Sequence, residues 1–131
     1  MAKKVGVLLI ASMFLVLFSI TSYAAESTDL RIDNIRILDP YLTAGQHGVL
    51  LLSLTNNLDT RLKDLEVRVI LLPGYEIIGR STSIDIKKGD IENRKLQIDI
   101  PSYIDPGYYL IKISVKNSDF KRTKIREIYI Q

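Results

Sequence analysis

The chain has 131 residues and a formal net charge of +3, to which Lys3 and Lys4 contribute two. The other basic and acidic side chains nearly balance, so the concentrated basic excess of nucleic-acid binders is missing and no nucleic-acid partner is expected. Cysteine is absent, which excludes disulfide crosslinks. Packing and backbone hydrogen bonds must therefore stabilise a chain whose length suits a single domain.

Residues 1–24 are predicted to be a secretory signal helix. A basic start precedes the charge-free apolar residues 5–20, and Ser22 and Ala24 are small residues at the spacing that a signal peptidase reads. We therefore expect cleavage after Ala24 and an exported protein, either secreted or in the cell envelope. The alternative is an uncleaved anchor, because an apolar helix of this length spans a bilayer at ~1.5 Å per residue. Membrane contact would then be confined to this segment.

The remaining residues, 25–131, are predicted to form one all-β domain. Their apolar residues recur with period two, the period of a strand with one buried face, and short turns separate the runs. Seven such runs without a helical segment favour an immunoglobulin-like antiparallel β-sandwich. The expected strands lie in residues 30–38, 49–56, 65–72, 76–86, 95–101, 104–117 and 123–130.

The first and last strands change phase along their length, which predicts a β-bulge in each. In the first strand the apolar positions slip by one residue at Asp33–Asn34. In the last strand Ile125 and Ile128 are out of phase, so a bulge is expected near Arg126–Glu127. One extra residue in a strand of an antiparallel pair produces such a slip.

The stretch IDPGYYLIKISVKN, residues 104–117, predicts a corner that leads into the sixth strand. Residues 105–107 form a turn, in which proline presets φ and glycine allows a positive φ. The alternation places Tyr109 at the rim of the core, where its hydroxyl can bond to the backbone a few residues upstream, as in a tyrosine corner. Tyr109 is therefore expected to be architectural. The alternative is that Tyr108 and Tyr109 form a sugar-stacking pair.

Four short motifs follow one another along residues 30–131. They are LRI in the first strand, AG before the second, LTNN followed by LKDLEVRV, and DPGYY before the sixth. In this order they resemble the CARDB-type and related immunoglobulin-like domains of archaeal and bacterial surface proteins. The resemblance implies an extracellular structural or adhesion module, often attached to larger surface-layer proteins. It implies no functional residues, because the family has no common site.

No group of residues suggests catalysis or metal binding, so a non-enzymatic protein without a cofactor or metal is expected. His47 is the only histidine, and a zinc site needs several nitrogen or sulfur ligands. It is also the only imidazole base that could activate a nucleophile. The acidic residues are dispersed over turns and lack the ligand density of a calcium loop.

The third and sixth strands predict an apolar surface patch. They are antiparallel neighbours in this fold, so their outward residues should cluster. An exposed apolar patch on the order of a few hundred Å² usually marks an interface, which makes another cell-surface or envelope protein the expected partner. The alternative is that residues 74–79, GYEIIG, cover the patch. Its predicted members are Ile70, Leu72, Tyr108 and Leu110.

The sixth and seventh strands also predict a cationic surface, because these two strands normally pair. Such a surface would attract an anionic envelope polymer or lipid headgroups. The alternative is a charged face that keeps the sheet soluble and prevents edge pairing. Its predicted members are Lys112, Lys116, Lys121, Arg122 and Lys124, with Arg126 at its border.

Two hypotheses of function follow from these surfaces. The first is an exported, non-enzymatic module that makes structural or adhesive protein–protein contacts. The second is a module that binds carbohydrate or an anionic polymer through the cationic strands and the loop tyrosines Tyr41, Tyr75 and Tyr103. It gains support if the three rings lie in one plane at one end of the sandwich. The weak fourth strand or the final strand could also accept a strand from a partner.

Overall fold

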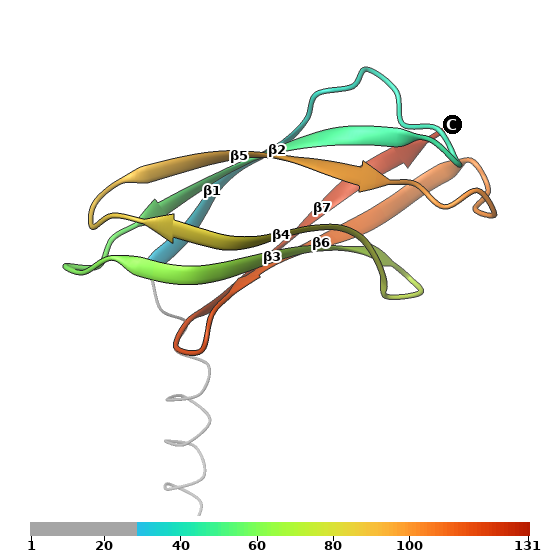
Figure 1. The fold of residues 1–131 in the computed structure, drawn as a ribbon. Coiled ribbons are helices and arrows are strands. Elements are labelled where there is room, and N and C mark those ends of the chain that lie inside the picture. The colour runs from blue at the N-terminus through green and yellow to red at the C-terminus, as the bar shows by residue number, and fades with distance from the viewer. Residues whose placement is uncertain (1–28) are drawn as a thin grey trace, which may run out of the picture.

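Residues 29–131 are described by the computed structural model, and they form an all-β domain of seven strands (Figure 1). The predicted signal helix, residues 1–24, lies outside the described residues. Between residues 29 and 131 there is no helix that could cross a membrane. The strands are β1 (Leu30–Ile37), β2 (His47–Asn56), β3 (Leu62–Leu72), β4 (Glu76–Ile86), β5 (Ile91–Asp99), β6 (Gly107–Lys116) and β7 (Lys121–Ile130).

The strands form two antiparallel sheets that pack face to face (Figure 1). One sheet has three strands in the order β1-β2-β5, and the other has four in the order β4-β3-β6-β7. The predicted pairing of the third strand with the sixth, and of the sixth with the seventh, is confirmed. The all-β, two-sheet architecture is therefore the one that the period-two pattern predicts.

The inner faces of the two sheets bury the alternating apolar residues. Leu50, Leu52 and Leu54 of β2 are completely buried. They belong to one core with Ile111 and Ile113 of β6, in the other sheet, which are equally inaccessible. Each of these side chains contributes about 1.5–3 kcal/mol when it is removed from water. In a chain without cysteine, this packing must supply stability without help from disulfides.

The bulge predicted in the first strand is confirmed. The pairing of β1 with β2 shifts between Ile32 and Asn34, so Asp33 is the extra residue. Its carboxylate accepts a hydrogen bond from the hydroxyl of Thr55 on β2. The bulge is thus held by a polar contact between the two strands while Ile32 stays in the core.

The bulge predicted near Arg126–Glu127 is wrong. The pairing of β7 with β6 continues from Gly107–Ile130 to Lys116–Lys121 without a shift. Ile125 therefore points away from the core and is 54% exposed. The inward position beside it belongs to Lys124, whose ammonium donates a hydrogen bond to the carbonyl of Ile32 at 3.3 Å. A long lysine side chain can lie over apolar surface and still place its charge at the rim, so the strand needs no bulge.

Gly79 lets the two sheets approach each other where β4 passes β5. A Cβ at this position would lie 3.0 Å from Cγ2 of Ile98 and 3.1 Å from the carbonyl oxygen of Gln97. Both atoms belong to β5 in the opposite sheet. A larger residue would push the sheets apart, so glycine is required for close contact at this edge.

Asn56 joins the two sheets at the end where β1 begins. Its side chain is fully buried. Nδ2 donates hydrogen bonds to the carbonyl oxygens of Thr60 and Ile86, both at 2.9 Å, and Oδ1 accepts one from the N–H of Leu58 at 2.9 Å. One side chain therefore holds the β2–β3 turn against the end of β4 and satisfies all of its own polar groups.

Replacement of Asn56 by aspartate should lower the free energy of unfolding by about 3 kcal/mol. A carboxylate cannot donate to the Thr60 and Ile86 carbonyls, and it would be a buried charge without a partner. Urea unfolding followed by circular dichroism measures the change. Asn34→Asp is the matched control, because Asn34 is exposed and its replacement should change stability by less than about 0.5 kcal/mol. Equal losses in both variants would contradict this role of Asn56.

Candidate functional site

Three connections meet at the end of the sandwich opposite to the start of β1 (Figure 1). They are the β1–β2 loop, the β3–β4 turn and the β5–β6 loop, and this end is termed the distal end. Backbone hydrogen bonds tie the connections to their surroundings: the N–H of Gly45 donates to Ile100 at 2.9 Å, and that of Gln131 donates to Leu42 at 2.8 Å. The loops of the distal end are therefore held in place by backbone hydrogen bonds.

Each distal connection carries one of the three predicted loop tyrosines. Tyr41, Tyr75 and Tyr103 are 67%, 75% and 73% exposed, respectively. Among residues 29–131, no ring contact joins these three tyrosines. They share one end of the sandwich without forming a single aromatic cluster.

The outward side chains of the four-stranded sheet form an apolar patch that reaches the distal end. Strand pairing places Leu72 opposite Leu110 and Ile70 opposite Ile77. Tyr108 and Tyr129 are also opposite partners, with ring centroids 4.9 Å apart and an interplanar angle of 60°. Edge-to-face pairs of this kind are favourable. The patch, termed the distal patch, consists of Ile70, Leu72, Ile77, Tyr108, Leu110 and Tyr129.

The structure brings the four predicted patch residues together. Tyr108 and Leu110 are 73% and 43% exposed, and Ile70 and Leu72 are partly exposed. Residues 74–79 do not cover them, because Ile77 lies beside Ile70 and is itself 43% exposed. The segment extends the patch onto β4 instead.

Ile77 and Tyr129 belong to the patch although the strand periodicity does not single them out. Ile77 lies in an irregular strand, whose pairing with β3 shifts three times. Tyr129 alternates with the buried Ile128 and Ile130, which signals an outward side chain. Only the register of β7 on β6 places it opposite Tyr108.

Away from the distal end, the same sheet face is charged. Nε of Arg68 donates to Oε1 of Glu66 at 2.7 Å, and Nε of Arg80 lies 3.9 Å from the same oxygen. The hydrogen bond from Arg68 lowers the pKa of Glu66 below its ordinary value. The apolar patch thus has a defined polar border on this side.

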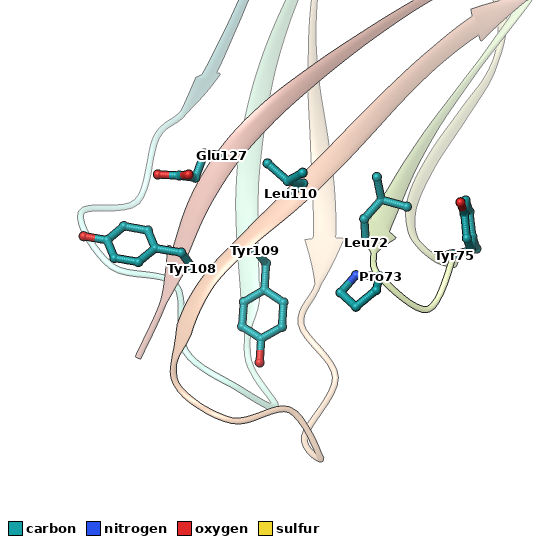
Figure 2. A pocket seen from close by; sticks show the side chains of 7 residues that line it. All are labelled: Leu72, Pro73, Tyr75, Tyr108, Tyr109, Leu110 and Glu127. Carbon is teal, nitrogen blue, oxygen red and sulfur yellow. The ribbon is translucent and has the colours of Figure 1, made fainter.

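A shallow hollow of about 370 Å³ lies at the distal end of the patch (Figure 2). Tyr75 and Tyr108 stand at its two sides, with Pro73 and Tyr109 between them. A second hollow of about 210 Å³ adjoins it, with Leu72, Pro73 and Tyr109 common to both. The first hollow is lined by Leu72, Pro73, Tyr75, Tyr108, Tyr109, Leu110 and Glu127.

Tyr109 links this surface to the fold. Its hydroxyl donates a hydrogen bond to the carbonyl of Asp105, four residues upstream, at 2.6 Å. This is the hydrogen bond of a tyrosine corner. The ring is partly buried against the core and also forms the wall between the two hollows. The residue that secures the corner therefore also shapes the site.

Tyr75 adopts a backbone conformation that is unfavourable for its residue type. Its φ is +55°, in the left-handed region, directly after Gly74 with a φ of +72°. A non-glycine residue there costs roughly 1–2 kcal/mol. The ring is 75% exposed, so packing within the domain returns little of this cost. Asp64 and Ser83 share this left-handed conformation, but neither carries an exposed aromatic ring.

Tyr75→Asn should raise the free energy of unfolding by about 0.5–1 kcal/mol, because asparagine tolerates the left-handed region better than tyrosine. Urea unfolding of the variant and the unmodified domain measures the difference. A loss of stability would show that the Tyr75 ring packs for the fold and would remove the argument from strain.

Tyr103 at the second hollow is held by Glu76 of β4. The phenol hydroxyl donates a hydrogen bond to the Glu76 carboxylate, and this bond raises the pKa of Tyr103 above its ordinary value. The neighbouring negative charge acts in the same direction, since it disfavours a phenolate. The β5–β6 loop is thereby tied to the β3–β4 hairpin at the distal end.

Glu76→Gln should lower the pKa of Tyr103. The folded-state pKa lies above that of the unfolded chain, so the contact stabilises the domain below about pH 10 and the contribution is lost as pH rises through the folded-state pKa. Titration followed by phenolate absorbance, with Tyr103→Phe to identify the Tyr103 signal, measures the change. An unchanged Tyr103 titration in Glu76→Gln would contradict the contact.

The predicted cationic residues do not form one surface. Lys116 lies directly opposite Lys121, and both share the outer face with Lys112. Arg122 and Lys124 instead lie opposite the buried Val115 and Ile113, so they are on the other face of β7. The structure therefore divides the cations between the outer face of the sheet and the rim of the sandwich.

His47 lies away from the distal patch, at the start of β2. Its Nδ1 is 2.5 Å from Oδ1 of Asp99 on β5, and Nε2 of Gln97 donates to the same oxygen at 3.1 Å. These hydrogen bonds from Gln97 and His47 lower the pKa of Asp99. Within residues 29–131 no group of three or more His, Cys, Asp or Glu side chains could hold a metal ion.

Solved structures of other proteins share this fold. One is the crystal structure of the CARDB domain of the PF1109 protein from Pyrococcus furiosus in complex with di-metal ions. It matches with a TM-score of 0.59 and 12% identity, and the match covers 79% of this chain and 88% of that one. Its solution structure matches with a TM-score of 0.60, 13% identity and coverage of 80% and 96%. The fold is a CARDB-like β-sandwich.

The crystal structure of a FixG-related protein from Vibrio parahaemolyticus is also similar, with a TM-score of 0.59, 10% identity and coverage of 80% of this chain and 99% of that one. No protein-family profile matches the chain. No curated protein matches it by sequence. At these identities the comparisons establish the fold and carry no functional residues.

Proposed function

We propose that this protein is an exported, non-enzymatic immunoglobulin-like module of the cell envelope that binds another envelope protein through the distal patch. The apolar face formed by the pairs Leu72–Leu110 and Ile70–Ile77, continued by Tyr108 and Tyr129, carries the proposal. Contiguous exposed apolar surface is unusual on a soluble domain unless a partner covers it.

The composition of the patch suits protein–protein contact. Tyrosine is enriched at the centres of interfaces, because it adds a large buried area with few rotatable bonds. Tyr75 and Tyr108 flank the hollow, so a partner side chain could insert between two aromatic rings (Figure 2). The strained backbone of Tyr75 adds support, since the ring is kept where the fold gains little from it.

The orientation of the domain fits the same role. The described chain starts at the end of the sandwich opposite to the distal connections (Figure 1). Attachment to the envelope through the N-terminal side would leave the distal patch directed outward, where a partner can reach it.

The double variant Leu72→Lys and Leu110→Lys should abolish capture of the partner from a native envelope fraction. It places two charges at the centre of the patch, where desolvation without a partner is unfavourable. The measurement is a pull-down with residues 25–131, with bound proteins identified by mass spectrometry. Thermal unfolding of the variant must show that the domain is still folded.

Thr82→Lys with Ser118→Lys is the matched control, because it adds the same charge at exposed positions away from the distal end. This control should capture the partner as the unmodified domain does. Tyr75→Asn should weaken capture without loss of stability. Capture that survives the double leucine change, or that fails equally in the control, would refute the patch as the interface.

A further inference from the structure

β7 is an edge strand of the four-stranded sheet, and its pairing with β6 is regular. Within residues 29–131 it pairs with β6 over its full length. On its other side the strand makes one backbone bridge, between Leu42 and Ile130, and the Lys124 side chain reaches the Ile32 carbonyl of β1. The opposite edge of the same sheet, β4, is interrupted by register shifts and passes close to β5 at Gly79. Of these two edges, β7 is therefore the one with the geometry for accepting another strand.

Hydrogen bonds at the C-terminus show which backbone groups of β7 point to the open side. The N–H of Gln131 donates to Leu42 at 2.8 Å, and the carbonyl of Gln131 accepts from the N–H of Ala44 at 3.4 Å. Gln131 thus faces away from β6. The backbone N–H and C=O groups of successive residues in a strand point to opposite sides. Every second residue that precedes Gln131 therefore directs these groups away from β6. Those that take part in no strand pairing on this side are Lys121, Thr123, Ile125 and Glu127.

The side chains of β7 select the charge of an added strand. The strand carries Lys121, Arg122, Lys124 and Arg126 against the single acid Glu127. Lys124 and Arg126 lie on the face toward the other sheet, opposite Ile113 and Ile111. Cations at an edge repel basic strands and a second copy of β7, but they attract an acidic strand.

We propose that β7 binds an extended acidic segment of a partner protein, which adds to the four-stranded sheet by backbone pairing. Acidic residues at alternate positions of this segment lie opposite Lys124 and Arg126. The intervening residues are apolar and lie beside Ile125, which is 54% exposed on the outer face. The preferred ligand therefore alternates carboxylate and aliphatic side chains. The open-edge residues 121–127 of β7 include none of the six residues of the distal patch.

Synthetic seven-residue peptides test this proposal by fluorescence anisotropy at low ionic strength. A peptide of alternating glutamate and valine should bind. A block peptide of the same composition should bind at least about tenfold more weakly, because its charges cannot all lie on one face. N-methylation of alternate backbone nitrogens facing β7 should have a similar effect, because it removes the pairing N–H groups. Equal affinity for all three peptides would overturn the proposal.

Variants of β7 test the same contact from the protein side. Arg126→Glu should weaken binding of the alternating peptide at least about tenfold, because a like charge then lies opposite the glutamate residues of the peptide. Thr123→Pro should also weaken it, because proline removes one open-edge N–H while the ladder to β6 is retained. Thr123→Ala is the control and should bind as the unmodified domain does. In amide hydrogen exchange, the peptide should protect the N–H groups of Thr123 and Ile125.

The Leu72→Lys and Leu110→Lys variant separates this proposal from that of the distal patch. It should bind the alternating peptide with unchanged affinity, because neither residue lies on β7. Absence of peptide binding by the unmodified domain, or binding without protection of the Thr123 and Ile125 amides, would refute the β7 proposal and leave the patch proposal intact.

Discussion

The antiparallel pairing of β3 with β6 is the constraint on which the rest of the structure depends. This pairing places Val69 opposite Ile113 on the inner face and Leu72 opposite Leu110 on the outer face. The side-chain period is two, so a slip of one residue would expose the core residues and bury the patch. The same register therefore secures the sandwich and assembles the candidate site.

The distal end combines tight construction with exposed aromatic surface. The Tyr109 hydroxyl closes the corner before β6, and the Tyr103–Glu76 contact ties two connections together. The exposed rings thus stand on a scaffold held by hydrogen bonds. Tyr75 contributes strain to this end rather than packing. A rigid aromatic surface loses little conformational freedom when a partner binds, which favours affinity.

The outer face of the four-stranded sheet and its β7 edge suggest two different modes of recognition. The distal patch offers side-chain surface formed by β4, β3, β6 and β7, and its energetics would be those of apolar burial. The edge of β7 offers backbone groups with cations alternating on one face, and its energetics would depend on pairing and charge. The patch would respond little to salt, whereas the edge would lose affinity as salt rises. The two surfaces do not overlap in their members, so one partner can engage both at once.

The sequence by itself determined the features that depend on local periodicity. Strand identity, the inward residues of β1 to β6, the β1 bulge and the position of Tyr109 could all be predicted, because alternation with period two indicates which side chains a sheet buries. The predicted patch residues also followed, because β3 and β6 pair in this class of fold. The bulge in β7 could not be predicted correctly: the pattern shows that Ile125 and Ile128 are out of phase, but not that Lys124 can occupy an inward position by reaching the Ile32 carbonyl.

Only the tertiary structure decided the features that depend on register and on contacts between distant segments. Ile77 and Tyr129 belong to the patch because they pair with Ile70 and Tyr108. Asn56 became the polar link between the sheets through carbonyls of Thr60 and Ile86. The predicted cationic surface divided because residues on opposite faces of β7 are neighbours in sequence but not in space. These features have one physical reason in common. The periodicity of a strand indicates which face of the sheet a side chain is on, whereas the register between strands decides which side chains are its neighbours.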